Sequence, residues 1–333
     1  MSTIFDVAKK AGVSIVTVSR LMNNPKVVSS RTAEKIFRVM ESLHYQPNHI
    51  ARSLVGKKTN TIGVIMPDIK NTFFNSWYRF IEEYANEQNI NLLLCNTDDD
   101  AAKELKYVKL LHAQRVDGVI IAPYSKKSIE YLTSINMHFI LFDRLFKGFK
   151  GDFVTTDHYR GAVEAVEYLL SLGHRKIAVL KGPGIIYSDT ERYAAFTETM
   201  KKHRTNIYKE FVINCEFNEE IAFNATRELL LRKERPTVIF TFAGLMTKGA
   251  IKAIEDLHLS IPDDISLLGF DDIPGQDIFR PNITHVIQDI STLGKSVTLA
   301  LLNTIKDPDS TERTRMSIKP TLVVGDSCKR LKS

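Results

Sequence analysis

The first 60 residues carry side chains suited to binding a polyanion. They contain ten Lys or Arg against three Asp or Glu, whereas the remaining residues contain 35 basic and 36 acidic side chains. A basic segment on a nearly neutral chain is where nucleic acid would bind. Charge alone is explained better by a solubilising surface than by nucleic-acid binding. The pattern of residues within the segment must therefore distinguish the two.

Residues 15–22 have the spacing of a helix whose outward face could contact the edges of DNA bases. Val18, Leu21 and Met22 form its inward apolar stripe. Arginine pairs with O6 and N7 of guanine, and apolar side chains contact the thymine methyl group. Two alternatives stay open: the arginine contacts phosphate or solvent, and one of the two β-branched residues packs under a following helix. The outward side chains are Ile15, Val16, Ser19 and Arg20.

Three short helices are expected to hold this face in place. The first ends at Gly12, Ser14 can cap the second, and Asn23-Asn24-Pro25 ends the second. A third begins after Ser29 or Ser30. The inward residues are Ile4, Val7, Ala8 and Ala11 in the first helix and Ala33, Ile36, Phe37 and Met40 in the third.

Two short helices joined by a glycine-bearing turn and backed by a third predict a helix-turn-helix. The second helix of this motif enters the major groove of DNA. Phosphate contacts could come from nearby hydroxyl and amide groups, although helix capping explains the serines equally well. These candidate phosphate ligands are Ser14, Thr17, Asn23 and Ser29.

From residue 61 onward, apolar strands alternate with helical patterns. Continuous apolar strands separated by helices indicate parallel sheets covered on both faces. Because about 270 residues exceed one such sheet, we predict two doubly wound lobes with a binding cleft at the carboxyl ends of the strands. The strand candidates are Ile62–Met66, Ile90–Cys95, Val116–Ala122, Phe139–Phe142, Ile177–Leu180, Phe211–Cys215, Val238–Phe242 and Ile265–Phe270.

An ordered series of motifs covers nearly the whole chain. It comprises Thr3–Ser14, Thr17–Asn23, Tyr45–Asn48, Ala51–Leu54, Thr61–Ile69, Asp143-Arg144, Leu172-Gly173-His174, Gly269–Asp272 and Arg280-Pro281. In this order the motifs resemble the LacI/GalR family of bacterial repressors. The resemblance implies a homodimeric transcription regulator with a core like that of the periplasmic sugar-binding proteins. Its partners would be palindromic double-stranded operator DNA and a small-molecule effector.

The resemblance also implies a division of the chain. Residues 1–46 would form the DNA-binding head, 47–60 a hinge helix and linker, and 61–333 the core for effector binding and dimerisation. Lobe 1 would span about 61–160 plus 291–320, and lobe 2 about 161–290 plus 321–333. In the hinge, Leu54 would wedge into the minor groove, supported by Asn48, Ala51 and Arg52. A flexible linker with an incidental leucine is the alternative.

Carried over by position, the effector pocket would have aromatic walls and a few charged groups. Two departures from the family pattern leave the effector open. Ala243-Gly244 replaces a common Asn-Asp, and Thr72 replaces a proline. The effector could be a sugar, an acidic or phosphorylated sugar, or the pocket could be degenerate. The expected lining is Asp68, Asn71, Phe73, Phe74, Asp143, Arg144, Ser188, Arg192, Phe217, Phe242, Asp271 and Gln288.

Other functional classes lack their sequence signatures. We expect no enzyme, because there is no phosphate loop, dinucleotide fingerprint or nucleophile elbow. The three cysteines form no CxxC pair, which disfavours a disulfide framework or a zinc site, and we expect no metal and no cofactor. No apolar run suits a membrane span and no signal-peptide pattern opens the chain, so we expect a cytoplasmic protein. The histidines, which are interpreted as surface or core residues, are His112, His138, His158, His174, His203, His258 and His285.

Two other functions share much of this pattern. A global catabolite regulator would have the same organisation but would respond to a docked phosphoprotein. A solute-binding protein without a regulatory role would share the core, and the basic head argues against it.

Overall fold

The computed structural model describes residues 2–23, 27–45, 59–273 and 280–331. The chain divides into two compact units, Met1–Thr59 and Asn60–Ser333. Each unit has its own hydrophobic core. Among the residues described, no helix is long and apolar enough to cross a membrane.

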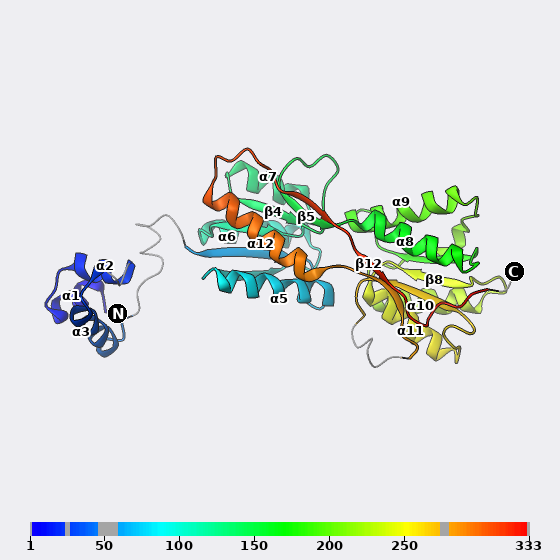
Figure 1. The fold of residues 1–333 in the computed structure, drawn as a ribbon, viewed down its shortest axis with the longest axis horizontal. Helices are drawn as coiled ribbons and strands as arrows, with labels where there is room; N and C mark the ends of the chain where they lie inside the picture. The colour runs from blue at the N-terminus through cyan, green and yellow to red at the C-terminus, as the bar shows by residue number, and fades with distance from the viewer. Residues whose placement is uncertain (1, 24–26, 46–58, 274–279, 332–333) are drawn as a thin grey trace. The chain divides into compact units, whose positions relative to one another are not determined.

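The first unit contains the three predicted helices, α1 (Ile4–Ala11), α2 (Ile15–Asn23) and α3 (Ser30–Ser42) (Figure 1). Thr3 and Asp6 form a capping box at the start of α1, and Gly12 ends that helix with a left-handed φ of 61°. The hydroxyl of Ser14 accepts a hydrogen bond from the Thr17 amide at 3.1 Å, so it caps α2 as expected. The core of this unit is Val7, Ala8, Ala11, Val18, Leu21, Ile36 and Met40.

Phe37 is a correction to the predicted core, because its side chain is 50% exposed. Ile36 and Met40, four residues apart, form the buried stripe of α3. Phe37 follows Ile36 by one position, which rotates its side chain by about 100° around the helix and away from the stripe. The prediction that Phe37 is buried was therefore wrong, because it rested on the apolar character of the side chain alone.

The second unit contains two six-stranded sheets. In the first, the strand order is β11-β5-β4-β3-β1-β2, and every pair is parallel. Separate apolar clusters line its two faces, so the sheet is covered on both sides. Its strands are β1 (Thr61–Met66), β2 (Asn91–Asn96), β3 (Gly118–Ile121), β4 (Phe139–Phe142), β5 (Phe153–Thr156) and β11 (Arg315–Ile318), and its helices are α5 (Thr72–Glu87), α6 (Ala101–Ala113), α7 (Lys126–Ser134) and α12 (Ile290–Lys306).

The second sheet has the order β12-β10-β9-β8-β6-β7. Its pairs are parallel except that β12 runs antiparallel to β10. Its strands are β6 (Ile177–Lys181), β7 (Val212–Asn214), β8 (Val238–Thr241), β9 (Ser266–Phe270), β10 (Thr284–Ile287) and β12 (Thr321–Val323), and its helices are α8 (His158–Ser171), α9 (Tyr187–Lys202), α10 (Glu219–Leu231) and α11 (Gly244–Asp256), with a 3-10 turn η2 (Lys209–Phe211) before β7.

The predicted fold class is confirmed: an α-helical head is followed along the chain by two parallel-sheet α/β lobes, with the antiparallel β12 as an exception. β12 follows β11 after only Lys319 and Pro320, so it enters the second sheet from the end at which the parallel strands finish. All eight predicted strands are present, with their ends within two residues. Four others, β5, β10, β11 and β12, were not predicted because each mixes polar with apolar residues and shows no continuous apolar run.

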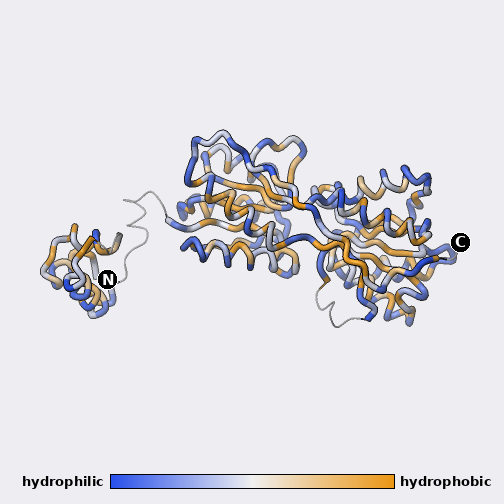
Figure 2. Tube along the Cα trace, in the orientation of Figure 1, coloured by the Kyte–Doolittle hydropathy of each residue, from blue (hydrophilic) through white to orange (hydrophobic). Residues whose placement is uncertain are grey.

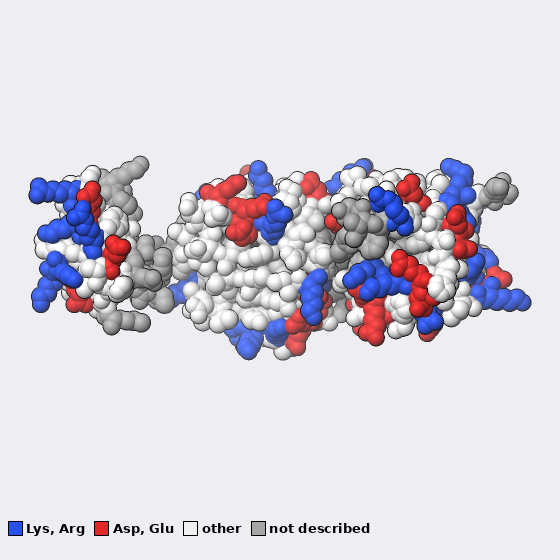
Figure 3. Space-filling view, turned by 90° about the horizontal axis from the view of Figure 1, so that it is seen from below, with Lys and Arg blue, Asp and Glu red and all other residues white. Residues whose placement is uncertain are grey.

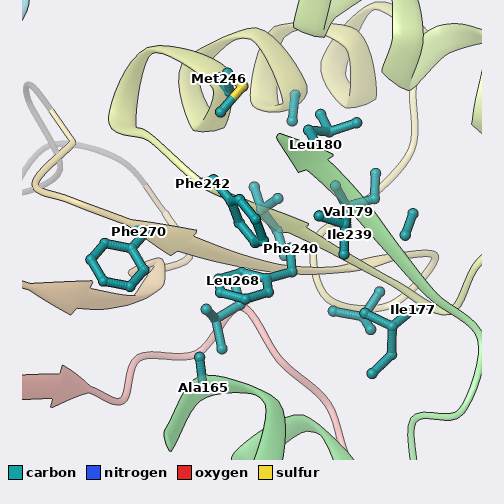
Figure 4. Packing of buried hydrophobic residues seen from close by; sticks show 14 of the residues in the cluster. Ala165, Ile177, Val179, Leu180, Ile239, Phe240, Phe242, Met246, Leu268 and Phe270 are labelled. Carbon is teal, nitrogen blue, oxygen red and sulfur yellow. The ribbon is translucent and has the colours of Figure 1, made fainter. Parts of the chain in front are cut away.

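The strands supply most of the apolar core. Figure 2 shows the central strands as the most hydrophobic parts of the second unit. In the second sheet, Phe240 and Phe242 pack edge to face at 5.1 Å, close to Leu268 and Ala165 (Figure 4). The chain crosses between the sheets three times, after β5, after β10 and after β11. These crossings lie at the carboxyl ends of β5, β10 and β11, the end of each sheet where parallel strands finish.

Candidate functional site

A pocket lies between the strand ends of the two sheets. It brings together ten of the twelve residues predicted to line it, together with Ala243, which sequence analysis had noted only as a departure from the family pattern. The lining is Asn71, Phe73, Phe74, Asp143 and Arg144 from the first-sheet side, and Ser188, Arg192, Phe217, Ala243, Asp271 and Gln288 from the second-sheet side.

The other two predicted residues lie nearby. Asp68 lines an outer chamber of about 540 Å³ that shares Asn71, Phe74, Arg144 and Phe217 with the pocket. Phe242 lines neither cavity, because its side chain is fully buried in the core of the second sheet. Its carbonyl oxygen instead accepts a hydrogen bond from Arg192.

Strained backbone conformations place two carboxylates in the pocket. Asp143 directly follows β4 and has a φ of 58°, and Asp271 directly follows β9 and has a φ of 71°. Phe217 also has a positive φ, of 55°. The left-handed region is uncommon for non-glycine residues, and such positions cluster at functional sites.

Arg192 is the most highly connected group of the site. Its Nη2 lies 3.3 Å and its Nη1 3.5 Å from the two carboxylate oxygens of Asp271. Gln288 donates a hydrogen bond to the same carboxylate and accepts one from Thr156. The guanidinium carbon is 3.6 Å from the centre of the Phe270 ring. These contacts fix a planar guanidinium at the bottom of the pocket.

A buried histidine joins the two sides of the site. His158 Nε2 lies 3.1 Å from Asp143 Oδ1, within hydrogen-bonding distance but without the geometry of a well-directed hydrogen bond. Burial alone would raise the pKa of Asp143, but His158, Arg192 and Arg144 outweigh it and hold that pKa below its usual value. Sequence analysis interpreted His158 as a surface or core residue; it is buried, and its contacts with the site residues were not predicted.

A buried aspartate shapes the loop before α9. The two carboxylate oxygens of Asp189 accept hydrogen bonds from the amides of Gly182 and Gly184 and lie near Lys181 Nζ at 3.2 Å. A Cβ on Gly182 would come within 2.4 Å of the Phe217 ring. The glycine therefore allows that ring to pack beside the pocket, while α9 carries Ser188 and Arg192 into it.

The Ala243-Gly244 departure has a structural reason. A Cβ on Gly244 would lie 2.4 Å from the carbonyl oxygen of Asp272, so a side chain there has no room. Ala243 is the N-cap of α11 and supplies no capping hydrogen bond. The segment that follows Asp271 therefore approaches the start of α11 closely, and the pocket wall at this point is a methyl group.

Substitution of Gly244 is expected to destabilise the second unit. Gly244→Ala should lower the free energy of unfolding by about 1–3 kcal/mol, because backbone atoms cannot yield as a flexible side chain would. The neighbouring Ala243→Ser should do the opposite by about 0.5–2 kcal/mol, because serine can cap α11. Urea unfolding of both variants measures these changes. An equally stable Gly244→Ala protein would show that the close approach is absent.

The first unit presents the predicted base-reading face. Ile15 and Val16 are 37% and 58% exposed, Arg20 is exposed and Ser19 is half-buried. The serines predicted as phosphate ligands cap helices, Ser14 through Thr17 and Ser29 through Thr32. Asn23 is the last residue of α2. Figure 3 shows that Lys and Arg outnumber Asp and Glu on the visible face of this unit.

The predicted hinge residues Asn48, Ala51, Arg52 and Leu54 lie outside the described residues. Their assignment to the minor groove stays a prediction.

Comparisons with known proteins identify the family. Residues 3–48 match the model of bacterial regulatory proteins of the lacI family, and residues 59–324 match that of periplasmic binding proteins and the sugar-binding domain of the LacI family. The chain belongs to the LacI family of bacterial regulatory proteins.

Relatives and solved structures agree with this assignment. The transcriptional regulator DegA of Bacillus subtilis is 36% identical, over 88% of each chain. The ribose operon repressor of Halalkalibacterium halodurans is 35% identical, over 99% of this chain and 98% of its own. The lac repressor dimer bound to operator and an anti-inducer is 26% identical, with a TM-score of 0.87 over 98% of this chain and 99% of its own. These relatives are regulators and not enzymes.

Proposed function

We propose that this protein is a transcriptional repressor that binds a palindromic operator as a homodimer and is controlled by a small, neutral, sugar-like effector in the pocket. The observation that carries the choice of effector is the pairing of the pocket's charges. We infer that the protein works in the cytoplasm, because the operator lies there.

Both cations of the inner pocket are already matched with carboxylates. Arg144 makes a two-point contact with Asp99, and Arg192 makes one with Asp271. Arg144, Arg192 and Asp271 are largely withdrawn from solvent, whereas Asp99 is 40% exposed. A phosphate or carboxylate would have to displace a partner carboxylate or bind without a counter-charge, and either is costly in a buried site.

The outer chamber also disfavours anions. Acidic side chains on its wall outnumber basic ones, and Lys248 is 3.0 Å from the carboxylate of Glu219. Hydroxyl groups, by contrast, can both donate to Asp143 and Asp271 and accept from Arg144 and Arg192. The rings of Phe74 and Phe217 supply apolar surface for a sugar ring, as expected for small-molecule sites.

A thermal-shift panel tests the effector class. Neutral D-ribose, D-glucose and cellobiose are compared with ribose 5-phosphate and glucose 6-phosphate. A ligand that binds only the folded protein raises its stability by RT ln(1 + [L]/Kd). At least one neutral compound should raise the melting temperature more than any phosphate. A response restricted to the phosphates would contradict the neutral-effector proposal.

The homodimer is supported by the symmetry of operator recognition and by exposed apolar side chains. A palindrome is read by a two-fold dimer of heads. The edge strand β2 exposes Leu93 and the adjacent α6 exposes Leu110, at 40% and 46%. Sedimentation of a fragment that begins at Asn60 should still give a dimer. A monomeric fragment would place the dimer contacts in the head.

Selection of operator sites tests the alternative of a global regulator. Many unrelated sites would favour that alternative over a local repressor.

A further inference from the structure

We propose that His158 is a positioning residue for effector binding. A neutral imidazole, protonated on Nε2, joins Asp143 to Arg192 and holds both groups in the orientation in which they meet the effector. The inference rests on the proposed function of the pocket, and it assigns a role to a residue that does not itself line that pocket.

The tautomer follows from the neighbours. His158 Nδ1 lies 3.2 Å from Nη2 of Arg192. A guanidinium has hydrogens to donate but no lone pair with which to accept. Nδ1 must therefore be the acceptor, and the single proton of the neutral ring is on Nε2, 3.1 Å from the Asp143 carboxylate. The ring thus accepts from the cation on one side and presents a proton to the anion on the other.

The location of His158 suits it to align groups from both sheets. It is the first residue of α8, directly after the chain crosses from the first sheet to the second, and it is 1% exposed. Asp143 lies on the first-sheet side of the pocket and Arg192 on the second-sheet side. Because a buried ring in fixed packing has one orientation, it fixes the carboxylate and the guanidinium relative to each other.

The groups around His158 determine what a second proton on the ring would do to its contact with Arg192. The charged and titratable groups near the ring are Asp143 after β4, Arg192 on α9, Asp271 after β9 through its pair with Arg192, and Tyr187, whose ring centre is 6.1 Å away. The Phe270 ring, 6.2 Å away, closes the apolar side. A second proton on Nδ1 would remove the acceptor for Arg192 and set N–H against N–H. The observed arrangement therefore requires the neutral ring.

Two substitutions separate positioning from packing. His158→Gln keeps one acceptor and one donor, whereas His158→Phe keeps ring volume and removes both. The probe is the neutral sugar that raises the melting temperature of the full-length wild type most. His158→Phe should weaken its binding by about 10- to 100-fold, the value of hydrogen bonds to charged groups. His158→Gln should bind the sugar within a few-fold of wild type, because it keeps a donor and an acceptor.

A second measurement does not depend on the sugar. Long-range proton–nitrogen NMR of the full-length wild type should show a histidine with Nε2 protonated, whose Nδ1 signal shifts in Arg192→Met and which is missing in His158→Gln. A ring protonated on Nδ1, or full sugar affinity in a folded His158→Phe protein, would overturn the inference. If no sugar binds the wild type, the neutral-effector proposal fails, and the NMR signal alone then decides whether the ring accepts from Arg192.

Discussion

Operator binding by this protein is expected to weaken by about 10³- to 10⁵-fold as salt rises from about 50 to 200 mM, the range for roughly six to ten phosphate contacts. The head holds most of the chain's excess positive charge, and its described Lys and Arg side chains are exposed. Each phosphate that a cation neutralises releases condensed counterions, so log affinity should fall linearly with log salt. Fluorescence anisotropy with an operator duplex selected from a random library measures the slope.

One substitution should separate base reading from phosphate binding. Arg20→Ala should cost about 1–3 kcal/mol and relax the preference at one base pair, because an exposed arginine on the outward face of α2 can pair with a guanine edge. Arg38→Ala is the matched control, since Arg38 is likewise exposed but lies on α3, 3.7 Å from Glu34. It should leave base preference unchanged. A flat salt response, or unchanged preference in Arg20→Ala, would contradict the assignment.

The helical head was predictable because its local signals agree. Apolar spacing, the capping residues Ser14 and Ser29 and the left-handed Gly12 all act within one or two helical turns. The error at Phe37 arose where two adjacent apolar residues competed for one stripe. A strand such as β3 was found because it is buried on both faces and apolar, whereas β11, of the same length, is largely exposed and contains Arg315 and Ser317.

The pocket lining was carried over by position from the family resemblance and did not depend on strand recognition, since Gln288 follows the unpredicted β10 and still lies in the pocket. Asp143 and Asp271 follow strands that the sequence revealed, and each does lie in the pocket. His158 follows β5, which the sequence did not reveal, and no motif gave it a role, so it was interpreted only as a surface or core residue. The pairing of Arg144 with Asp99 joins residues 45 positions apart and depends on tertiary packing. Charge pairing, which favours a neutral effector, therefore could not be inferred from the chain alone.

Removal of Arg192 is expected to abolish the effector response and to destabilise the second unit. Arg192→Met leaves the carboxylate of Asp271 in a buried site with only Gln288 as a hydrogen-bond donor among its contacts described above. Breaking a buried ion pair by removing one partner typically costs about 3–5 kcal/mol. Urea unfolding should show this loss, and the neutral sugar that stabilises the wild type should no longer raise the melting temperature.

The double variant Arg192→Met/Asp271→Leu distinguishes lost stability from lost binding. Because it removes both buried charges, it should recover much of the stability lost in the single variant, as replacement of a whole buried pair by apolar groups often does. It should still show no response to the sugar, since the groups that meet hydroxyls are gone. Operator binding without sugar should be retained, because the head is a separate compact unit.

In the wild type, effector and operator should alter each other's affinity by the same factor, about 5- to 150-fold, because coupling between two binding sites is reciprocal. In the double variant that factor should be one. A double variant that regains stability and still responds to the sugar would show that the Arg192–Asp271 pair supports the fold without contacting the effector. A double variant that folds but no longer binds operator would show that the pair acts on the head, and the pocket would then be part of the DNA-binding state itself.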